Sequence, residues 1–92
     1  MIRVFVVYEG EPDPARYEEH VALCEKVEGA TFRHGKVFGT PVGEPNFRYY
    51  AEFEFADMDV FKAAARTPEF MATGVDAREM GIPAQAYFAD VS

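Results

Sequence analysis

The chain has 92 residues, of which 49% are hydrophobic and 27% are charged, so it can bury a hydrophobic core and is not expected to be disordered. At this length we expect residues 1–92 to form a single domain. Nine Lys and Arg residues against sixteen Asp and Glu residues give a net charge of −7, which would repel a phosphate backbone or an anionic membrane, so neither partner is expected.

A strand and a helix are predicted at the start of the chain. Residues 2–8 are mostly β-branched or aromatic, which is typical of a strand. Asp13 followed by Pro14 is typical of a helix N-terminus, and the helix is expected to continue to about Val27. One side of this helix carries an apolar stripe that we expect to pack on a sheet: Tyr17, His20, Val21, Leu23, Cys24 and Val27.

Two further strands are predicted, joined by a loop. Residues 30–38 alternate in character and are interpreted as the second strand, and the two glycines and two prolines of residues 39–46 are typical of a loop. Residues 47–55 form the clearest strand, because one face is apolar and its reverse carries polar and ionisable groups. The polar face is made up of Arg48, Tyr50, Glu52 and Glu54.

The last third of the chain predicts a helix, a short irregular segment and a strand. Asp57 is expected to cap a helix that ends at about Arg66. Pro68–Met80 is interpreted as one or two short helical turns broken at Gly74, and residues 84–91 as the last strand. The order β-α-β-β-α-β predicts an α+β, ferredoxin-like fold, in which a four-stranded antiparallel sheet carries its helices on one face.

The second face of such a sheet has no cover within the chain. Aromatic side chains such as Tyr50 would be exposed there beside Arg48, Glu52 and Glu54, and a mixed face of this kind suits a partner or a ligand. We therefore expect a homodimer in which two copies stack these faces into a dimeric α/β barrel. The interior of that barrel would hold a small molecule.

Several kinds of chemistry are not expected. Cys24 is the only cysteine, so neither a disulfide nor a cysteine-based zinc site is predicted, and a cytoplasmic location is favoured. The longest apolar run, Val4–Tyr8, is far shorter than the roughly 20 residues of a membrane-spanning helix. The two histidines and scattered carboxylates lack metal-ligand spacing, and no glycine-rich phosphate loop follows a strand, so no metal or cofactor is expected.

Several segments, taken in order, resemble the EthD family of the dimeric α/β-barrel superfamily. They are Met1–Tyr8, Tyr17–Leu23, Val37–Pro41, Tyr49–Asp57 and Phe61–Glu69. The resemblance implies a homodimer with an internal cavity. Relatives in the superfamily include cofactor-independent isomerases, cyclases and monooxygenases that act on lactones, quinones and other small aromatic-derived molecules.

Two residues match positions that stand out in this family. His20, in His20-Val21-Ala22-Leu23, matches a histidine that members often carry in the first helix. Glu52 matches an acidic residue of the third strand. Glu54 stands where a bulky apolar residue is more usual in the family, so the resemblance implies a more acidic barrel interior in this chain.

Three candidate catalytic residues follow: His20, Glu52 and Tyr50. A neutral imidazole titrates near ~6.5, so His20 could act as a base at physiological pH; the alternative is a histidine packed under the sheet. Glu52 and Glu54, two residues apart on one strand face, could raise each other's pKa, and Tyr50 could donate a hydrogen bond to an enolate oxygen. The alternatives are a Tyr50 ring that fills the dimer interface and carboxylates that pair with nearby cations: Arg33, Lys36 and Arg48.

Three further residues are candidates for substrate binding: Arg48, Glu54 and His34. His34 reaches the pocket only if its face of the second strand points inward, and Phe32 beside it suggests packing against the helices instead. Cys24 lies on the buried side of the first helix without a cationic neighbour, so an inert packed thiol is favoured over a nucleophile.

The leading hypothesis is a cofactor-independent enzyme that moves a proton next to a carbonyl, as in isomerisation, cyclisation or elimination. Its substrate would be a lactone, a quinone or another aromatic-derived compound, and a monooxygenase-like reaction is a variant of the same idea. A non-catalytic ligand-binding or accessory protein of a degradative or biosynthetic pathway is the second reading. A charged sheet face that serves only as a dimer interface is the third.

Overall fold

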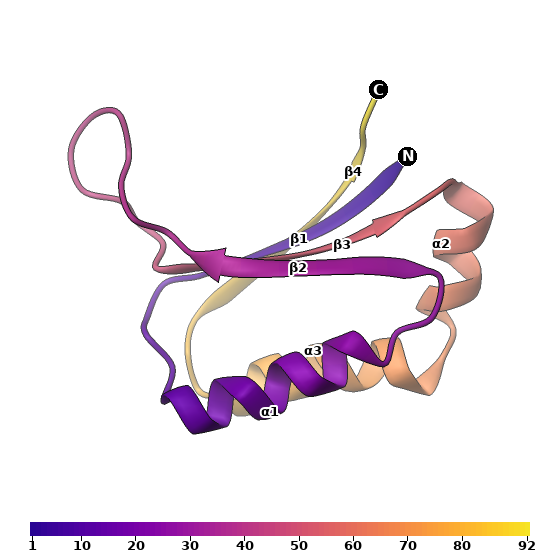
Figure 1. The fold of residues 1–92 in the computed structure, drawn as a ribbon, viewed down its shortest axis with the longest axis horizontal. Coiled ribbons are helices and arrows are strands. Elements are labelled where there is room, and N and C mark those ends of the chain that lie inside the picture. The colour runs from indigo at the N-terminus through magenta and orange to yellow at the C-terminus, as the bar shows by residue number, and fades with distance from the viewer.

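The computed structural model describes residues 1–92 and contains four strands and three helices (Figure 1). In chain order they are β1 (Ile2–Tyr8), α1 (Pro14–Glu25), β2 (Ala30–Lys36), β3 (Tyr49–Phe55), α2 (Met58–Ala65), α3 (Pro68–Glu79) and β4 (Ala84–Asp90). The α+β, ferredoxin-like arrangement predicted from the sequence is confirmed. The loop between β2 and β3 is longer than expected, because the glycines and prolines at its two ends keep Phe38 and Phe47 out of the strands.

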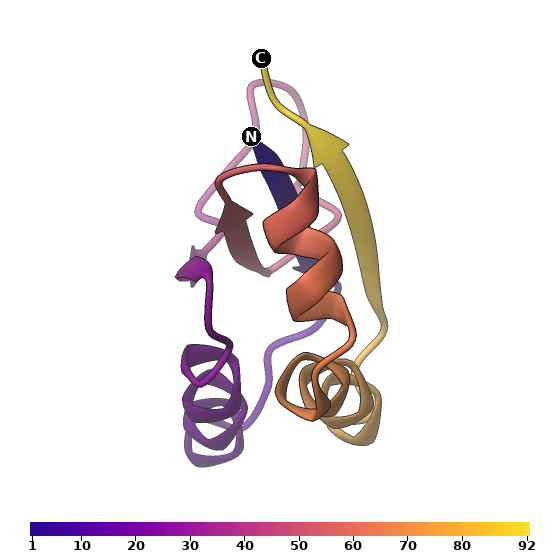
Figure 2. The same ribbon diagram turned by 90° about the vertical axis from the view of Figure 1, so that its right-hand side faces the viewer.

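The strands form one antiparallel sheet in the order β2-β3-β1-β4. Val4 of β1 lies between Phe53 of β3 and Phe88 of β4, and Tyr8 lies between Tyr49 and Ala84. The helices α1 and α3 lie side by side beneath one face of this sheet, and α2 stands at the end where β3 finishes (Figures 1 and 2). No element covers the opposite face, as the sequence predicts.

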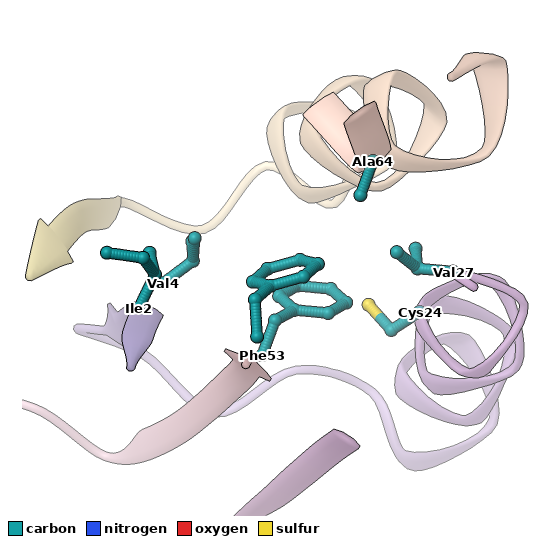
Figure 3. Packing of buried hydrophobic residues seen from close by; sticks show 7 residues of the cluster. Ile2, Val4, Cys24, Val27, Phe53 and Ala64 are labelled. Atoms are coloured by element: carbon teal, nitrogen blue, oxygen red, sulfur yellow. The ribbon is translucent and has the colours of Figure 1, made fainter. Parts of the chain in front are cut away.

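The hydrophobic core lies between the covered face of the sheet and the helices. Side chains from β1 and β3 point toward Cys24 of α1, toward Val27 just after this helix, and toward Ala64 of α2 (Figure 3). Phe55 is completely buried, and its ring lies 5.5 Å from that of Phe61. Because a fully buried Phe contributes about 1.5–3 kcal/mol relative to an exposed one, these rings hold the helices against the sheet.

The expectation of short helical turns broken at Gly74 was wrong. The segment is one continuous helix, α3, of 12 residues. Its start is fixed by Thr67, whose side chain accepts a hydrogen bond from the backbone N–H of Phe70, with Pro68 in the first turn. Gly74 in a helix interior costs about 1 kcal/mol relative to Ala, which packing of the helix offsets. The helix ends before Gly81, whose positive φ of 74° favours glycine.

None of the three helices combines the length and the apolar character needed to cross a bilayer.

Candidate functional site

His20 lies in the middle of the buried side of α1, with only 2% of its surface exposed. Both ring nitrogens have side-chain partners. Nδ1 lies 2.9 Å from a carboxylate oxygen of Asp76 in α3, and Nε2 lies 3.0 Å from the hydroxyl of Tyr8 at the end of β1. Three separate elements therefore fix the position and the orientation of this imidazole.

Asp76 is itself held by Arg16 of α1. The two guanidinium nitrogens lie 2.7 and 3.1 Å from the two carboxylate oxygens, which is a bidentate ion pair. The hydrogen bond from Arg16, followed by the one from His20, keeps the pKa of Asp76 below its usual range although burial opposes this shift. An ionised carboxylate can only accept, so Nδ1 of His20 must carry a proton. In the neutral imidazole, Nε2 then has the free lone pair.

Two protonated groups lie next to that lone pair. Burial raises the pKa of Tyr8 well above its ordinary value, so its hydroxyl stays protonated and donates to Nε2 of His20. The Sγ atom of Cys24 lies 3.7 Å from the same nitrogen, and burial raises the pKa of this thiol to about 12. Cys24 is therefore a neutral thiol at physiological pH, which is a poor nucleophile.

The side chains around Nε2 of His20 form part of the wall of a cavity of about 730 Å³ between the sheet and the helices. Nineteen residues line the cavity and fourteen of them are hydrophobic, which is the composition of a typical small-molecule site. The lining includes Tyr8, His20 and Cys24, together with side chains of β1, β3, β4 and α3. The sequence predicted a cavity between two paired sheets, whereas this one lies within a single chain.

Glu52, Glu54 and Tyr50 lie on the uncovered face of the sheet. Arg3 of β1 and Arg33 of β2 flank the two carboxylates at distances of 3.0 to 3.3 Å. The hydrogen bond from Arg3 is the main reason why the pKa of Glu54 lies below its ordinary value. The Tyr50 hydroxyl donates to Glu52 at 2.9 Å, and burial is the main reason why the pKa of Tyr50 is raised.

Glu52 and Glu54 therefore form ion pairs, which was the alternative to a catalytic role. Of the three cations expected as partners, however, two do not contact them. Arg33 pairs with both glutamates, and Arg3 takes the place foreseen for Arg48 and Lys36. Lys36 instead lies 3.3 Å from Glu11. The reason is the register: Arg3 lies opposite Glu54 and Arg33 lies opposite Glu52, whereas Lys36 lies opposite Tyr49 at the far end of β3.

The predicted catalytic residues do not lie together. Side chains alternate between the two faces of a strand, so Ala51, Phe53 and Phe55 point toward the helices while Tyr50, Glu52 and Glu54 point away from them. His20 lies on the helix side. The sheet therefore separates His20 from Glu52 and Tyr50, and one ligand cannot touch all three within a single chain.

His34 and Arg48 lie outside the lining of the cavity. His34 is exposed on the helix side of β2, where its ring stacks on Phe32 at 5.6 Å and its Nδ1 lies 3.3 Å from the Tyr17 hydroxyl. This is the helix packing that the sequence suggested for His34. Arg48 is exposed just before β3, and its backbone N–H donates to the carbonyl of Tyr8.

Sequence reasoning missed three residues that hold His20 in place, directly or through a neighbour: Tyr8, Arg16 and Asp76. Arg16 stands one helical turn before His20, on the same side of α1. Asp76 was hidden by the expected break at Gly74. In a continuous helix it lies near Thr73, on the side of α3 that faces α1. The cap at Thr67 and the glycine at position 81 were the sequence signals that mark the two ends of such a helix.

The Arg16–Asp76 pair predicts a pH-dependent contribution to stability. Asp76 has a depressed pKa in the folded state, so its contribution is present above its unfolded pKa of about 3.9 and is lost as the pH falls through the folded value. We expect Arg16→Gln to unfold at lower urea concentration than wild type at pH 7. The gap should close as the pH is lowered toward 2.

Arg66→Gln is the matched control, because Arg66 lies at the end of α2, outside the cavity. The expectation is contradicted if Arg16→Gln and Arg66→Gln show the same stability at pH 7, or if the difference between Arg16→Gln and wild type persists unchanged at pH 2.

No group of three or more His, Cys, Asp and Glu side chains is arranged to hold a metal ion. The carboxylates of Glu52 and Glu54 are paired with arginines, and Asp76 is paired with Arg16 and His20.

Comparison with known proteins gives structural relatives only. No family model matches the chain, and no curated protein matches it in sequence. Among solved structures, an EthD family protein from Bacillus halodurans superposes with a TM-score of 0.82 over 100% of this chain and 99% of its own, at 24% identity. A dimeric ferredoxin-like protein of unknown function from Jannaschia sp. gives a TM-score of 0.76 over 98% of both chains, at 20% identity.

A third solved structure has a described activity. SnoaB, a cofactor-independent oxygenase from Streptomyces nogalater, superposes with a TM-score of 0.63 at 16% identity, over 98% of this chain and 91% of its own. At identities this low, the superpositions show the shared fold alone. The chain therefore has, over its whole length, the ferredoxin-like fold of an EthD family protein, as the sequence resemblance implied.

Proposed function

We propose that this protein is a small-molecule enzyme that transfers a proton without a cofactor, with His20 as the base. The observation that carries this proposal is a buried imidazole, fixed by Asp76 on one nitrogen and by Tyr8 on the other, in the wall of a largely apolar cavity of about 730 Å³. A carboxylate that orients an imidazole is a common arrangement for acid–base catalysis, because it fixes which nitrogen accepts the proton.

The proposed reaction begins at a carbon next to a carbonyl group. Nε2 of His20 takes a proton from that carbon, and the electron pair of the broken C–H bond moves to the carbonyl oxygen to form an enolate. The Tyr8 hydroxyl, which stays protonated because it is buried, turns from Nε2 to donate a hydrogen bond to that oxygen. The imidazolium then returns the proton to another carbon in an isomerisation, or to a leaving group in an elimination.

The surroundings favour such a step. The negative charge of Asp76 lies next to Nδ1 and stabilises the imidazolium that forms. Hydrogen bonds to a developing oxyanion are worth more in apolar surroundings, and fourteen of the nineteen lining residues are hydrophobic. The cavity is large enough for a lactone, a quinone or another compound of one or two rings. A structural neighbour described as a cofactor-independent oxygenase supports chemistry without a cofactor on this fold.

We also propose that the protein works as a homodimer that stacks the uncovered sheet faces. The ring of Phe5 lies 5.2 Å from that of Tyr87 and 6.4 Å from that of Tyr50, which forms an aromatic stripe across this face. The charges beside it, those of Arg3, Arg33, Glu52 and Glu54, compensate one another. A neutral, partly aromatic face is suited to association, and a neighbour of the same fold is described as dimeric.

For the dimer, we expect sedimentation equilibrium to give twice the mass of the chain for wild type at micromolar concentration. Phe5→Glu should give a single chain, because it places an unpaired charge in the centre of the interface. Val42→Glu adds the same charge on the exposed loop and should remain dimeric. A monomeric wild type, or a Phe5→Glu variant that is still dimeric, would contradict the proposal.

The enzymatic proposal is tested by a ligand screen followed by a proton-exchange assay. Lactones, quinones and catechol derivatives are screened by thermal shift, and compounds that stabilise the protein are incubated with it in D₂O. For those compounds that carry a carbonyl group, we expect deuterium to enter at a carbon next to it, as followed by NMR. Stabilisation without exchange or product would instead favour the non-catalytic ligand-binding protein.

A further inference from the structure

The cavity has two chemically different ends. Tyr8 and Ala84 lie opposite each other at one end, whereas Val4 and Phe88 lie opposite each other at the other. Tyr8 and Val4 are four strand positions apart, which corresponds to about 13 Å. The end at Val4 is lined by the aromatic side chains of Phe53 and Phe88 and is apolar. The end at Tyr8 contains His20 and is polar.

Arg78 belongs to the polar end. The helix α3 runs from Phe70, whose ring lies 5.6 Å from that of Phe53 at the apolar end, toward Asp76 beside His20. Arg78 follows Asp76 by two residues and precedes the short turn that leads into β4 at Ala84. It lines the cavity and is exposed to solvent, so its side chain is accessible to a ligand that enters the cavity.

The guanidinium of Arg78 has no partner within the chain. The guanidinium groups of Arg3, Arg16 and Arg33 are each paired with carboxylates. Those of Arg78 and of two arginines outside the lining, Arg48 and Arg66, form neither an ion pair nor a hydrogen bond. The other polar side chains of the lining have partners within the chain: Tyr8 and His20 bind each other, and the Thr73 hydroxyl donates to the carbonyl of Phe70. Arg78 is thus the one charged group of the lining that is free to bind something else.

We propose that the ligand of this cavity is an apolar, ring-containing carboxylic acid whose carboxylate binds Arg78. This inference rests on the proposed function, since it assigns the substrate class of the His20 site. The ring system lies along the apolar walls, and the carboxylate at the polar end brings the adjoining carbon atoms toward Nε2 of His20. The planar guanidinium matches a carboxylate with two parallel hydrogen bonds, which sets orientation as well as affinity.

A position near the C-terminus of α3 is the competing explanation for Arg78. A cation in the last turn interacts favourably with the helix dipole. A lysine would serve that purpose equally well, but it cannot form the planar, two-pronged contact with a carboxylate. The variant Arg78→Lys therefore separates the two explanations, because only ligand recognition distinguishes arginine from lysine.

The test uses 2-naphthoate, its neutral amide 2-naphthamide, and 2-naphthyl phosphate as probes, with dissociation constants measured by calorimetry. We expect wild type to bind the carboxylate about tenfold or more tightly than the amide. Arg78→Gln should weaken the carboxylate about tenfold or more and leave the amide within about twofold, and Arg78→Lys should lose part of the preference. Arg66→Gln removes the same charge outside the cavity and should change neither.

Several outcomes would overturn the inference: a wild type that binds neither naphthalene probe or prefers the amide, an Arg78→Gln variant that keeps the preference, or a phosphate that binds more tightly than the carboxylate. The experiment measures binding alone, so it is independent of catalysis. His20→Gln should retain the carboxylate preference even if it has lost proton exchange. A protein that shows the preference without any exchange would support the carboxylate site and contradict the proposed enzyme.

Discussion

The His20→Gln variant is expected to exchange protons with a bound carbonyl compound about 10²–10⁴-fold more slowly than wild type, which is the usual contribution of a positioned general base. Glutamine keeps a polar side chain of similar length in the space beside Tyr8 and Asp76, but it has no basic nitrogen. The measurement is the rate of deuterium incorporation per enzyme molecule, at equal ligand saturation.

Asp76→Asn tests the same base through its positioning residue. The asparagine amide can donate to Nδ1 and so favours the tautomer in which Nε2 carries the proton, which removes the lone pair that faces the cavity. We expect a loss of rate that approaches that of His20→Gln, and a changed pH profile of the remaining activity. Asp59→Asn, an exposed carboxylate of α2, is the control and should match wild type.

A His20→Gln variant that keeps its rate within about threefold of wild type would remove His20 from the mechanism. Loss of exchange in Asp59→Asn as well would point to a general effect on folding. Far-UV circular dichroism and the midpoint of urea unfolding of each variant separate these two outcomes, because a folded variant without exchange has lost chemistry rather than structure.

Phe55→Ala is expected to destabilise the protein by about 3–5 kcal/mol, the usual cost of removing a buried aromatic ring. Phe55 is 0% exposed, and its ring lies 5.5 Å from Phe61 and 6.4 Å from Phe70. A domain of this length has a free energy of unfolding of about 5–14 kcal/mol. One substitution would therefore remove a large fraction of it, as measured by urea unfolding.

Phe38→Ala is the matched control, because Phe38 is 102% exposed on the loop between β2 and β3. The same chemical change there should alter the free energy of unfolding by less than about 0.5 kcal/mol. If Phe55→Ala is too unstable to purify, Phe55→Leu should still fold and be measurably less stable than Phe38→Leu. Equal costs at the two positions would contradict the placement of the core.

Much of the fold could be predicted because local signals agree with the final packing. The caps at Asp13 and Asp57 accept the backbone hydrogen bonds expected of them. The alternation along residues 47–55 correctly separates the buried from the uncovered face. The error at Gly74 has a physical reason: a glycine weakens a helix by only about 1 kcal/mol, and the cap at Thr67 together with tertiary packing outweighs that.

The site was harder to predict than the fold. The alternation of side chains along a strand shows that Glu52 and Ala51 point to opposite faces of the sheet. It does not show on which of these faces His20, a residue of a helix, will lie. The partners of His20 come from positions 12 residues before and 56 residues after it along the chain. The contact with Tyr8 depends on how α1 packs under β1, and the contact with Asp76 depends on how α1 packs beside α3. No local pattern encodes either arrangement.

The most direct test of the proposed site is a crystal structure of the wild-type protein with a compound found in the ligand screen. We expect the compound to occupy the cavity between the sheet and the helices of one chain, with a carbon next to its carbonyl group about 3–3.5 Å from Nε2 of His20. A compound bound instead between two chains on the uncovered sheet face, beside Glu52 and Tyr50, would contradict it.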